Sequence, residues 1–304
     1  MKIGIIEPKS FSAEAIELLQ QKAEVILWNG QDLEQFIADK TSLFVRLSIQ
    51  WNAQILESAS QLKYICSPTT GLNHIDQNYC TSHNIQILSL QGETDFLQTI
   101  RATPEHTLGL IIALMRNYRS AFIQSENDWD RDRFKGNEIY GSSIGIIGLG
   151  RVGSILANYL TCMGAKVSYY DPNVTDTNYI AFPDSLSLIN HNQMIVLCSS
   201  YDQTIGTILN QEHLEALKNK YFVNTARAEL YDESLLIQLA SKKHFKGLAI
   251  DVIQNEQSEN NHLVQLLALT KTSNTIITPH IGGATHQSMP KTELFIAKKF
   301  IQTI

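Results

Sequence analysis

One glycine-rich segment restricts the folds open to this chain more than any other feature. It is Gly148–Gly153, with the sequence GLGRVG; it directly follows the apolar run Ile144–Ile147, and apolar residues at helical spacing follow it. A strand, a G-x-G-x-x-G turn and a helix in this order are typical of a unit that binds a dinucleotide. We expect Gly148 to make the tight turn, Gly150 to let the backbone approach a pyrophosphate, and Gly153 to let helix and strand pack closely.

The start of that helix and the end of the next strand complete a nucleotide site. Around Arg151 and Val152, the free N–H groups and the dipole of the helix N-terminus favour phosphates. Asp171, followed by Pro172, ends the apolar run Val167–Tyr170, at about the 20-residue spacing of the motif. A carboxylate there accepts hydrogen bonds from a ribose and repels a 2′-phosphate, which predicts NAD rather than NADP. A glycine turn that binds nothing, or another nucleotide, is the alternative.

Short apolar runs alternate with segments of helical spacing along the chain, which predicts an α/β fold of parallel strands joined by crossover helices. The strands expected before the glycine segment are Lys2–Ile6, Val25–Trp28, Ser42–Val45, Leu62–Cys66 and Ile85–Leu88. The later ones are Ile144–Ile147, Val167–Tyr170, Met194–Leu197, Phe222–Asn224, Leu248–Ile250 and Ile276–Ile277. The second group fits a complete doubly wound sheet.

The two groups of strands are separated by two polar stretches with a long helix between them. The stretches are Gln91–Ala102 and Gln124–Asn137. We expect the helix to have Thr103 as its N-cap and Pro104 at its first position. Its apolar face is broad, which predicts packing between domains or subunits.

Composition excludes several classes of protein. Of the 304 residues 43% are hydrophobic and 18% charged, which suits a chain with a large core and not a disordered one. A net charge of −6 argues against a nucleic-acid partner, which requires clustered Lys and Arg.

No membrane span or signal core is visible, so we expect no membrane partner and a cytoplasmic location. The four cysteines lack metal-type spacing; we expect no metal, and reduced, half-buried thiols.

Three ionisable residues each come just past the end of a different strand in the second group. They are Arg227, Glu256 and His280. The carboxyl ends of parallel strands form the ligand-binding edge of a doubly wound sheet. An Arg, a Glu and a His beside a nicotinamide make a site for oxidising an alcohol next to a carboxylate. Each alone has an ordinary structural reading, as a surface cation, a solvated loop charge or a turn residue, so only their joint placement indicates function.

The motifs around these residues closely resemble the D-isomer-specific 2-hydroxyacid dehydrogenase family, nearly from end to end. The matching segments are Gly148–Gly153, Asn224–Arg227, Asp251–Glu256, Pro279–Gly283 and, more weakly, Ser67–Asp76. They are specific for the family but not for a substrate. The resemblance, to phosphoglycerate dehydrogenase-like members without a regulatory domain, implies an NAD-dependent enzyme that forms a homodimer.

The resemblance also implies roles for individual residues. Arg227 would hold the substrate carboxylate, His280 would exchange a proton with the C2 oxygen, and Glu256 would orient the imidazole. Further cofactor contacts would come from Cys198, Thr225, Asp251, Gly282 and Gly283. Backbone N–H groups would bind the substrate carboxylate at Thr70, Gly71 and Leu72. Arg46 is a candidate second cation for the substrate, with an ordinary strand-end arginine as an equal alternative.

The expected architecture is a Rossmann dinucleotide-binding domain inserted into a flavodoxin-like substrate domain. The cofactor domain would span 100–283, and the substrate domain 1–99 and 284–304. The two chain crossings would act as a hinge, and closure would bring the loop at Gly71 to Arg227 and His280.

Some residues depart from the family pattern. Gln257 replaces a usual Pro, Ala228–Glu229 replaces a glycine, and Cys198 and Ser200 stand where His and Pro are common. The segment Gly92–Ala102 is longer than usual, and is a candidate lid or substrate contact. Glu256 argues against a formate dehydrogenase, which carries Gln there.

Two other functions remain open. A non-enzymatic NAD(H)-sensing scaffold or co-repressor of the same fold is the main alternative, and it is disfavoured by the short C-terminus. A phosphite- or formate-type oxidoreductase is the third hypothesis.

Overall fold

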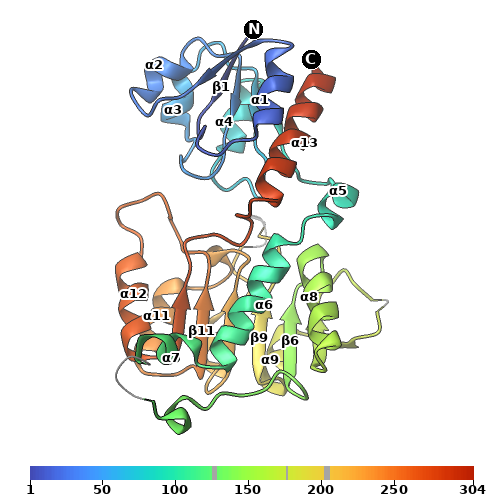
Figure 1. Cartoon of the computed structure of the whole chain (residues 1–304), viewed down its shortest axis with the longest axis vertical. Helices are drawn as coiled ribbons and strands as arrows, with labels where there is room; N and C mark the ends of the chain where they lie inside the picture. The colour runs from blue at the N-terminus through green and yellow to red at the C-terminus, as the bar shows by residue number, and fades with distance from the viewer. Residues whose placement is uncertain (125–128, 176, 202–205) are drawn as a thin grey trace. The chain divides into compact units, whose positions relative to one another are not determined.

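The computed structural model describes residues 1–124, 129–175, 177–201 and 206–304. The chain divides into two compact units (Figure 1). Unit 1 comprises Met1–Ile100 and Ala284–Ile304, and unit 2 comprises Arg101–Gly283. The chain leaves unit 1 and later returns to it, so unit 2 is an insertion.

Unit 1 is built on a five-stranded parallel sheet in the order β2-β1-β3-β4-β5. Its strands are β1 (Lys2–Ile5), β2 (Glu24–Leu27), β3 (Ser42–Phe44), β4 (Tyr64–Cys66) and β5 (Gln86–Leu88). Its helices are α1 (Ala13–Gln20), α2 (Leu33–Ile37), α3 (Ala53–Glu57), α4 (Gln77–Ser82), α5 (Thr94–Gln98) and α13 (Ser288–Thr303). The C-terminal helix α13 completes the core, because Ile296, Ala297 and Phe300 belong to the same hydrophobic cluster as the buried residues of β1. The strand order is that of a flavodoxin-like sheet, which confirms the predicted fold class.

Unit 2 is built on a seven-stranded parallel sheet in the order β12-β11-β10-β9-β6-β7-β8. Its strands are β6 (Ser143–Ile147), β7 (Lys166–Tyr170), β8 (Ile180–Ala181), β9 (Met194–Leu197), β10 (Tyr221–Asn224), β11 (Gly247–Ile250) and β12 (Thr275–Ile277). Its helices are α6 (Ala102–Met115), α7 (Tyr118–Gln124), η1 (Arg131–Phe134), α8 (Arg151–Cys162), α9 (Ser185–His191), α10 (Gln211–Ala216), η2 (Ala228–Leu230), α11 (Glu233–Ser241) and α12 (Leu263–Thr272). The strand order is that of a Rossmann sheet, again as predicted.

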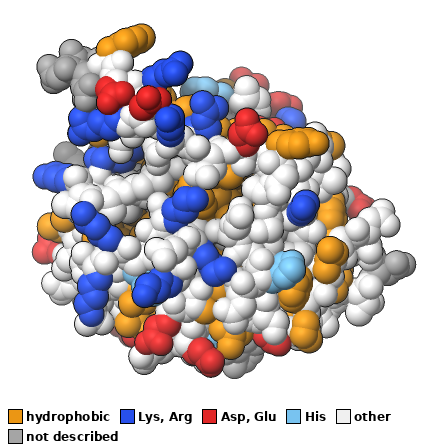
Figure 2. Space-filling view, turned by 90° about the horizontal axis from the view of Figure 1, so that it is seen from below, with side chains coloured by type: hydrophobic (Ala, Val, Ile, Leu, Met, Phe, Trp, Pro, Cys, Tyr) orange, Lys and Arg blue, Asp and Glu red, His pale blue; other side chains and the backbone are white. Residues whose placement is uncertain are grey.

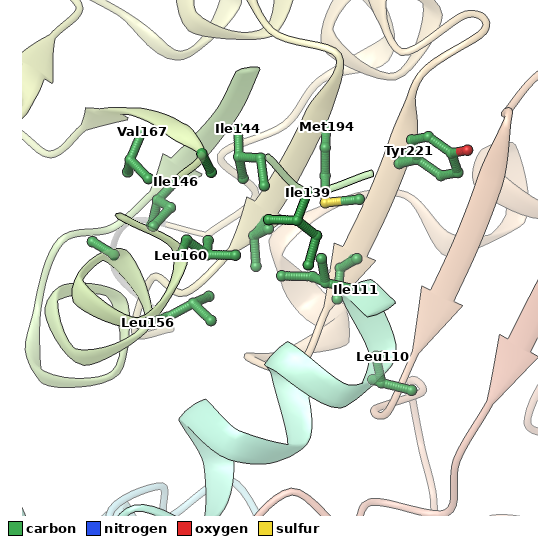
Figure 3. Packing of buried hydrophobic residues seen from close by; sticks show 14 of the residues in the cluster. Leu110, Ile111, Ile139, Ile144, Ile146, Leu156, Leu160, Val167, Met194 and Tyr221 are labelled. Carbon is green, nitrogen blue, oxygen red and sulfur yellow. The ribbon is translucent and has the colours of Figure 1, made fainter. Parts of the chain in front are cut away.

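Helix α6 differs from the prediction in its start. Its N-cap is Arg101, without a side-chain hydrogen bond, and Pro104 is the third helical residue. This position costs no hydrogen bond, since the N–H groups of the first turn have no intrahelical partner. The buried apolar residues of α6 belong to the core of unit 2. Figure 3 shows this core around Leu110, Ile111, Ile144, Leu156 and Leu160.

Other predictions also needed correction. The polar stretch Gln91–Ala102 contains α5, and residues 125–128 of the second polar stretch lie outside the described residues. Among the cysteines only Cys198 is half-buried, since Cys66 and Cys80 are buried and Cys162 is exposed; all four are free thiols.

No described helix is long and apolar enough to cross a membrane. The described residues include no His, Cys, Asp or Glu group able to hold a metal.

The net charge conceals a basic edge of unit 2. Two turns, one before β10 and one before β11, lie side by side: the Asn219 N–H donates to His244 O at 2.8 Å, and the Lys246 N–H to Lys220 O at 2.9 Å. These turns carry Lys218, Lys220, Lys242, Lys243 and Lys246. Figure 2, the view from below Figure 1, shows Lys and Arg side chains spread over this face. The edge lies at the amino ends of the strands, opposite the predicted site.

Candidate active site

The glycine turn between β6 and α8 has the geometry that the motif requires. Gly148 has φ +92, and a Cβ there would lie 2.6 Å from Ser199 N. A Cβ on Gly153 would lie 2.1 Å from Gly148 O, whereas one on Gly150 would meet nothing within 4 Å. Two glycines are therefore needed for packing, and the third leaves open space over the backbone. These are the three roles expected of a dinucleotide turn.

The N-terminus of α8 offers donors to an anion. Its N-cap is Gly150, which has no side chain to cap the helix, and the N–H groups of Val152 and Gly153 find no acceptor among the described residues. Burial, and then the positive charge of Arg101, lowers the pKa of the half-buried Arg151. Free N–H groups beside two guanidinium groups fit a pyrophosphate.

Asp171 lies at the end of β7, beside the glycine turn. Its Oδ2 accepts the Leu149 N–H at 2.8 Å, and its Oδ1 accepts the Asn173 N–H at 2.9 Å. A carboxylate has about four acceptor positions, so these two bonds fix Asp171 and leave capacity for ribose hydroxyls. Pro172 follows it and is exposed. The residues present therefore fit a dinucleotide with a free 2′-hydroxyl.

A pair of glycine substitutions tests this turn. We expect Gly153→Ala to lower the free energy of unfolding by about 1–3 kcal/mol and to weaken NADH binding, because its Cβ would collide with Gly148 O. Gly109 lies within α6 with nothing within 4 Å of its Cβ position. Gly109→Ala should therefore stabilise the chain by about 0.5–1 kcal/mol and leave binding intact. Thermal unfolding measures the stability of the two variants, and a fluorescence titration with NADH measures their affinity. Equal changes of stability and of NADH affinity in the two variants would refute the packing argument.

Glu256 and His280 form a carboxylate–imidazole pair. Glu256 Oε2 lies 2.8 Å from His280 Nδ1, with the side chains 25% and 26% exposed. His280 has φ +51, and its N–H donates to Asp251 O at 2.8 Å. Such a conformation is uncommon for a side-chain-bearing residue and concentrates at functional sites. Nε2 of His280 has no partner among the described residues, so it is the nitrogen left to exchange a proton.

Arg227 stands at the end of β10 on a braced turn. Asn224 holds this turn, because its side chain donates to Arg227 O at 3.0 Å and accepts the Ala226 N–H at 2.8 Å. Arg227 Nη1 donates to Ala226 O at 2.6 Å. Burial lowers the pKa of Arg227, against the opposing charges of Glu229 and Glu256. An arginine keeps its charge through such a shift, so a half-buried guanidinium is available to a carboxylate.

Asp251 has a structural role that the sequence did not reveal. Its Oδ1 accepts from the Thr278 hydroxyl at 2.6 Å and the Ile281 N–H at 3.0 Å, and lies 3.2 Å from His106 Nε2; its Oδ2 accepts the Gly282 N–H at 2.8 Å. Burial alone would raise the pKa of Asp251, but these hydrogen bonds outweigh it and lower the pKa. The ionised carboxylate therefore orders the turn that carries His280.

The other expected cofactor residues lie at the same edge of the sheet, each after a strand of unit 2. Thr225 is buried, with its Oγ1 2.7 Å from Thr107 Oγ1. Cys198 follows β9, and burial raises the pKa of its thiol to about 12. A Cβ on Gly282 would lie 2.9 Å from Asp251 Oδ2, whereas Gly283 is open.

The expected substrate residues belong to unit 1. The N–H groups of Thr70, Gly71 and Leu72 find no acceptor among the described residues, which suits an anion-binding loop. Arg46 is engaged instead: its guanidinium is hydrogen-bonded to Glu293 and donates to Lys9 O at 3.3 Å. This ion pair favours the structural alternative for Arg46.

The chain is similar to known proteins over most of its length. The family model of the D-isomer specific 2-hydroxyacid dehydrogenase NAD binding domain matches residues 108–282. The D-3-phosphoglycerate dehydrogenase of Methanocaldococcus jannaschii is 28% identical over 309 residues, which cover 98% of this chain and 56% of that relative. The glyoxylate reductase of Thermofilum pendens is 27% identical over 308 residues, which cover 95% and 88%. The chain thus spans about half the length of the phosphoglycerate dehydrogenase.

A solved structure shows the same fold. The crystal structure of D-lactate dehydrogenase from Aquifex aeolicus, complexed with NAD and lactic acid, has a TM-score of 0.83 to this chain. It is 22% identical and covers 99% of this chain and 96% of that one. The likeness therefore extends to both units.

Proposed function

The chain belongs to the D-isomer specific 2-hydroxyacid dehydrogenase family, and we propose that it is an NAD-dependent enzyme that interconverts a D-2-hydroxy acid and the matching 2-oxo acid. The observation that carries this proposal is the 2.8 Å contact between Glu256 Oε2 and His280 Nδ1, at the same sheet edge as Arg227 and the glycine turn. NAD, when bound, supplies the hydride-transfer chemistry. The protein supplies binding, orientation and a proton.

The three ionisable residues have different tasks in this proposal. Arg227 binds the substrate carboxylate and polarises the C2 oxygen, because its planar fork of donors suits two oxygens at once. His280 donates a proton from Nε2 to that oxygen during reduction and accepts it during oxidation. Glu256 holds the ring through Nδ1 and stabilises its protonated form.

Binding is assigned to the two units as follows. The α8 N-terminus, with Arg151, takes the pyrophosphate, and Asp171 the ribose. The Asp251 carboxylate already makes four contacts with the chain, and a carboxylate has about four acceptor positions. We therefore assign Asp251 mainly to ordering the His280 turn. The three N–H groups at residues 70–72 are the proposed further contact of the substrate carboxylate.

The test is NADH oxidation with a panel of 2-oxo acids. The named relatives are a D-3-phosphoglycerate dehydrogenase and a glyoxylate reductase, so the panel includes phosphorylated, glyoxylate-like, branched and aromatic members. We expect turnover with at least one of them. Tight NADH binding without turnover of any 2-oxo acid would contradict the proposal and favour an NAD(H)-sensing scaffold. Formate and phosphite are each incubated with NAD⁺, and formation of NADH with either one would favour a phosphite- or formate-type oxidoreductase.

The cofactor preference depends on Asp171. We expect the wild type to use NADH at least about tenfold better than NADPH, because its carboxylate would repel a 2′-phosphate. Asp171→Ser removes the charge and should reduce the ratio of kcat/KM for NADH to that for NADPH, mainly by lowering the KM for NADPH. Asp184→Ser, at the N-cap of α9, is the control and should leave the ratio unchanged. A wild-type preference for NADPH would contradict the argument.

Two further predictions concern the whole protein. We propose a homodimer in a cytoplasmic location. Sedimentation equilibrium of the full chain measures the first, and fractionation of the source cells the second.

A further inference from the structure

The catalytic Glu256 lies in a segment with no regular structure. Residues 251–262 run from the end of β11 to the start of α12 without a helix or strand. The local bonds of Glu256 are long: Oε1 accepts the Ile253 N–H at 3.4 Å, and its carbonyl accepts from the Asn261 side chain at 3.3 Å. Such bonds alone fix a carboxylate weakly, so its placement against His280 needs further support.

A second carboxylate holds this segment on both sides of Glu256. Glu233 is the first residue of α11 and is 1% exposed. Its Oε1 accepts the Gln254 N–H at 3.0 Å, and its Oε2 lies 2.7 Å from His262 Nδ1. One rigid, buried group therefore contacts the segment two residues before Glu256 and again at its C-terminal end.

The same segment is tied to the turn of Arg227. The Gln254 side chain donates to Ala228 O at 3.3 Å and to Tyr231 O at 3.1 Å. Ala228 directly follows Arg227 in the chain. The contacts that fix Glu256 thus also link it to the residue assigned to the substrate carboxylate.

The surroundings of Glu233 make the contact with His262 important. Burial raises the pKa of Glu233; His262 and the Gln254 N–H oppose this shift, and Glu229 adds to it. The first turn of α11 favours a negative charge. Without His262, the buried carboxylate would lose its 2.7 Å side-chain partner and the segment one of its two attachments to Glu233.

We propose that Glu233 and His262 are positioning residues that hold Glu256 against His280. The proposal rests on the proposed function, since it explains how the acid–base pair is kept in register. Neither residue belongs to the pair itself, so both act through Glu256.

The experiment compares variants of the full chain by proton NMR at one fixed pH. It follows the hydrogen-bonded Nδ1–H signal of His280, which is identified by its loss in His280→Ala. The main variant is His262→Ala, because the His262 side chain is 32% exposed and its removal should be tolerated. The charged groups beside the His280–Glu256 pair are Arg227 and Asp251, and both stay in place. The control is His213→Ala, which removes another imidazole of unit 2, bonded to Asn210 at 2.6 Å and Ser185 at 2.9 Å.

Glu256→Gln sets the full effect: the Nδ1–H signal of His280 should move upfield, since its carboxylate acceptor is gone. His262→Ala should move the signal in the same direction by a substantial part of that shift, and His213→Ala should leave it in place. In the 2-oxo acid assay, we expect His262→Ala to lower kcat about 10- to 100-fold with little change in KM. Glu233→Gln, which keeps the acceptor for Gln254, should restore most of the activity that Glu233→Ala loses.

A wild-type Nδ1–H signal in His262→Ala would overturn the proposal, and so would an unchanged signal in Glu256→Gln. The NMR measurement needs no turnover, so it decides the positioning role even if Glu233→Ala does not fold. A wild type that turns over no 2-oxo acid would refute the proposed function alone.

Discussion

Replacing His280 by Ala is expected to lower kcat for reduction of a 2-oxo acid by about 10²- to 10⁴-fold, with the Kd for NADH nearly unchanged. In the proposed mechanism the imidazole acts on the substrate oxygen through Nε2, since its Nδ1 is already bonded to Glu256 at 2.8 Å. Loss of the side chain removes the proton donor, while the glycine turn and Asp171 stay in place. Steady-state kinetics measure the first effect, and quenching of protein fluorescence by NADH the second.

The matched control is His244→Ala. This imidazole lies at the opposite edge of unit 2, with its Nε2 3.0 Å from Glu215 O and 3.2 Å from Leu214 O. The variant should keep wild-type turnover even if it unfolds at a lower temperature. Equal losses of turnover and NADH affinity in His280→Ala would contradict the role assigned to this residue.

The second large effect is expected from Arg227→Gln. Removing one partner of a desolvated charge pair costs about 2–5 kcal/mol, so kcat/KM for the 2-oxo acid should fall by roughly 30- to 5,000-fold. Among the described residues, the half-buried guanidinium donates a single hydrogen bond, from Nη1 to Ala226 O, so its loss should affect substrate binding more than folding. Arg227→Lys should recover part of the loss, since it keeps the charge but not the planar fork.

Arg46→Gln is the matched control for this variant. Its guanidinium pairs with the buried Glu293, so its removal leaves a buried carboxylate without its cation and should lower the melting temperature. We expect KM to change little. A large rise in KM with an unchanged melting temperature would restore Arg46 as a substrate residue, and an unchanged KM in Arg227→Gln would remove Arg227 from that role.

The parts of the fold that follow from sequence are those with a strong local pattern. All the strands expected from apolar runs are present, because buried parallel strands are continuously apolar. Strand β8 was missed since it has two residues, both exposed. Helix α5 was missed because its sequence, TDFLQ, is short and mostly polar. Thr103 was mistaken for an N-cap because Pro104 fits the third helical position as well as the first.

The residues of the site also divide into those with a local sequence signal and those without one. Gly148, Gly150 and Gly153 stand at a recognisable spacing between a strand and a helix, so their packing roles in the turn could be predicted. Glu233 and His262 carry no such signal: one looks like a first-turn acid, and the other lies in a polar loop. Their function arises from tertiary contacts to Gln254 and to each other, which no local pattern contains.

Charge was informative only locally. The net charge of −6 reveals neither the guanidinium groups near the glycine turn nor the lysines at the amino ends of β10 and β11. A small anionic substrate responds to the nearest cations, because the field of distant surface charges is screened within about 10 Å. Arg227 therefore matters more for an acidic substrate than the overall balance.

The most direct test of the central proposal is the stereochemistry of the product. The full chain is incubated with NADH and the best 2-oxo acid of the panel, and the hydroxy acid formed is separated on a chiral column. The acid used is the best one whose product has a stereocentre at C2, which leaves out glyoxylate because glycolate is achiral. The account predicts the D-2-hydroxy acid, formed in equal amount to the NADH consumed. The L-isomer, a racemic product, or NADH consumption without any 2-hydroxy acid would contradict it.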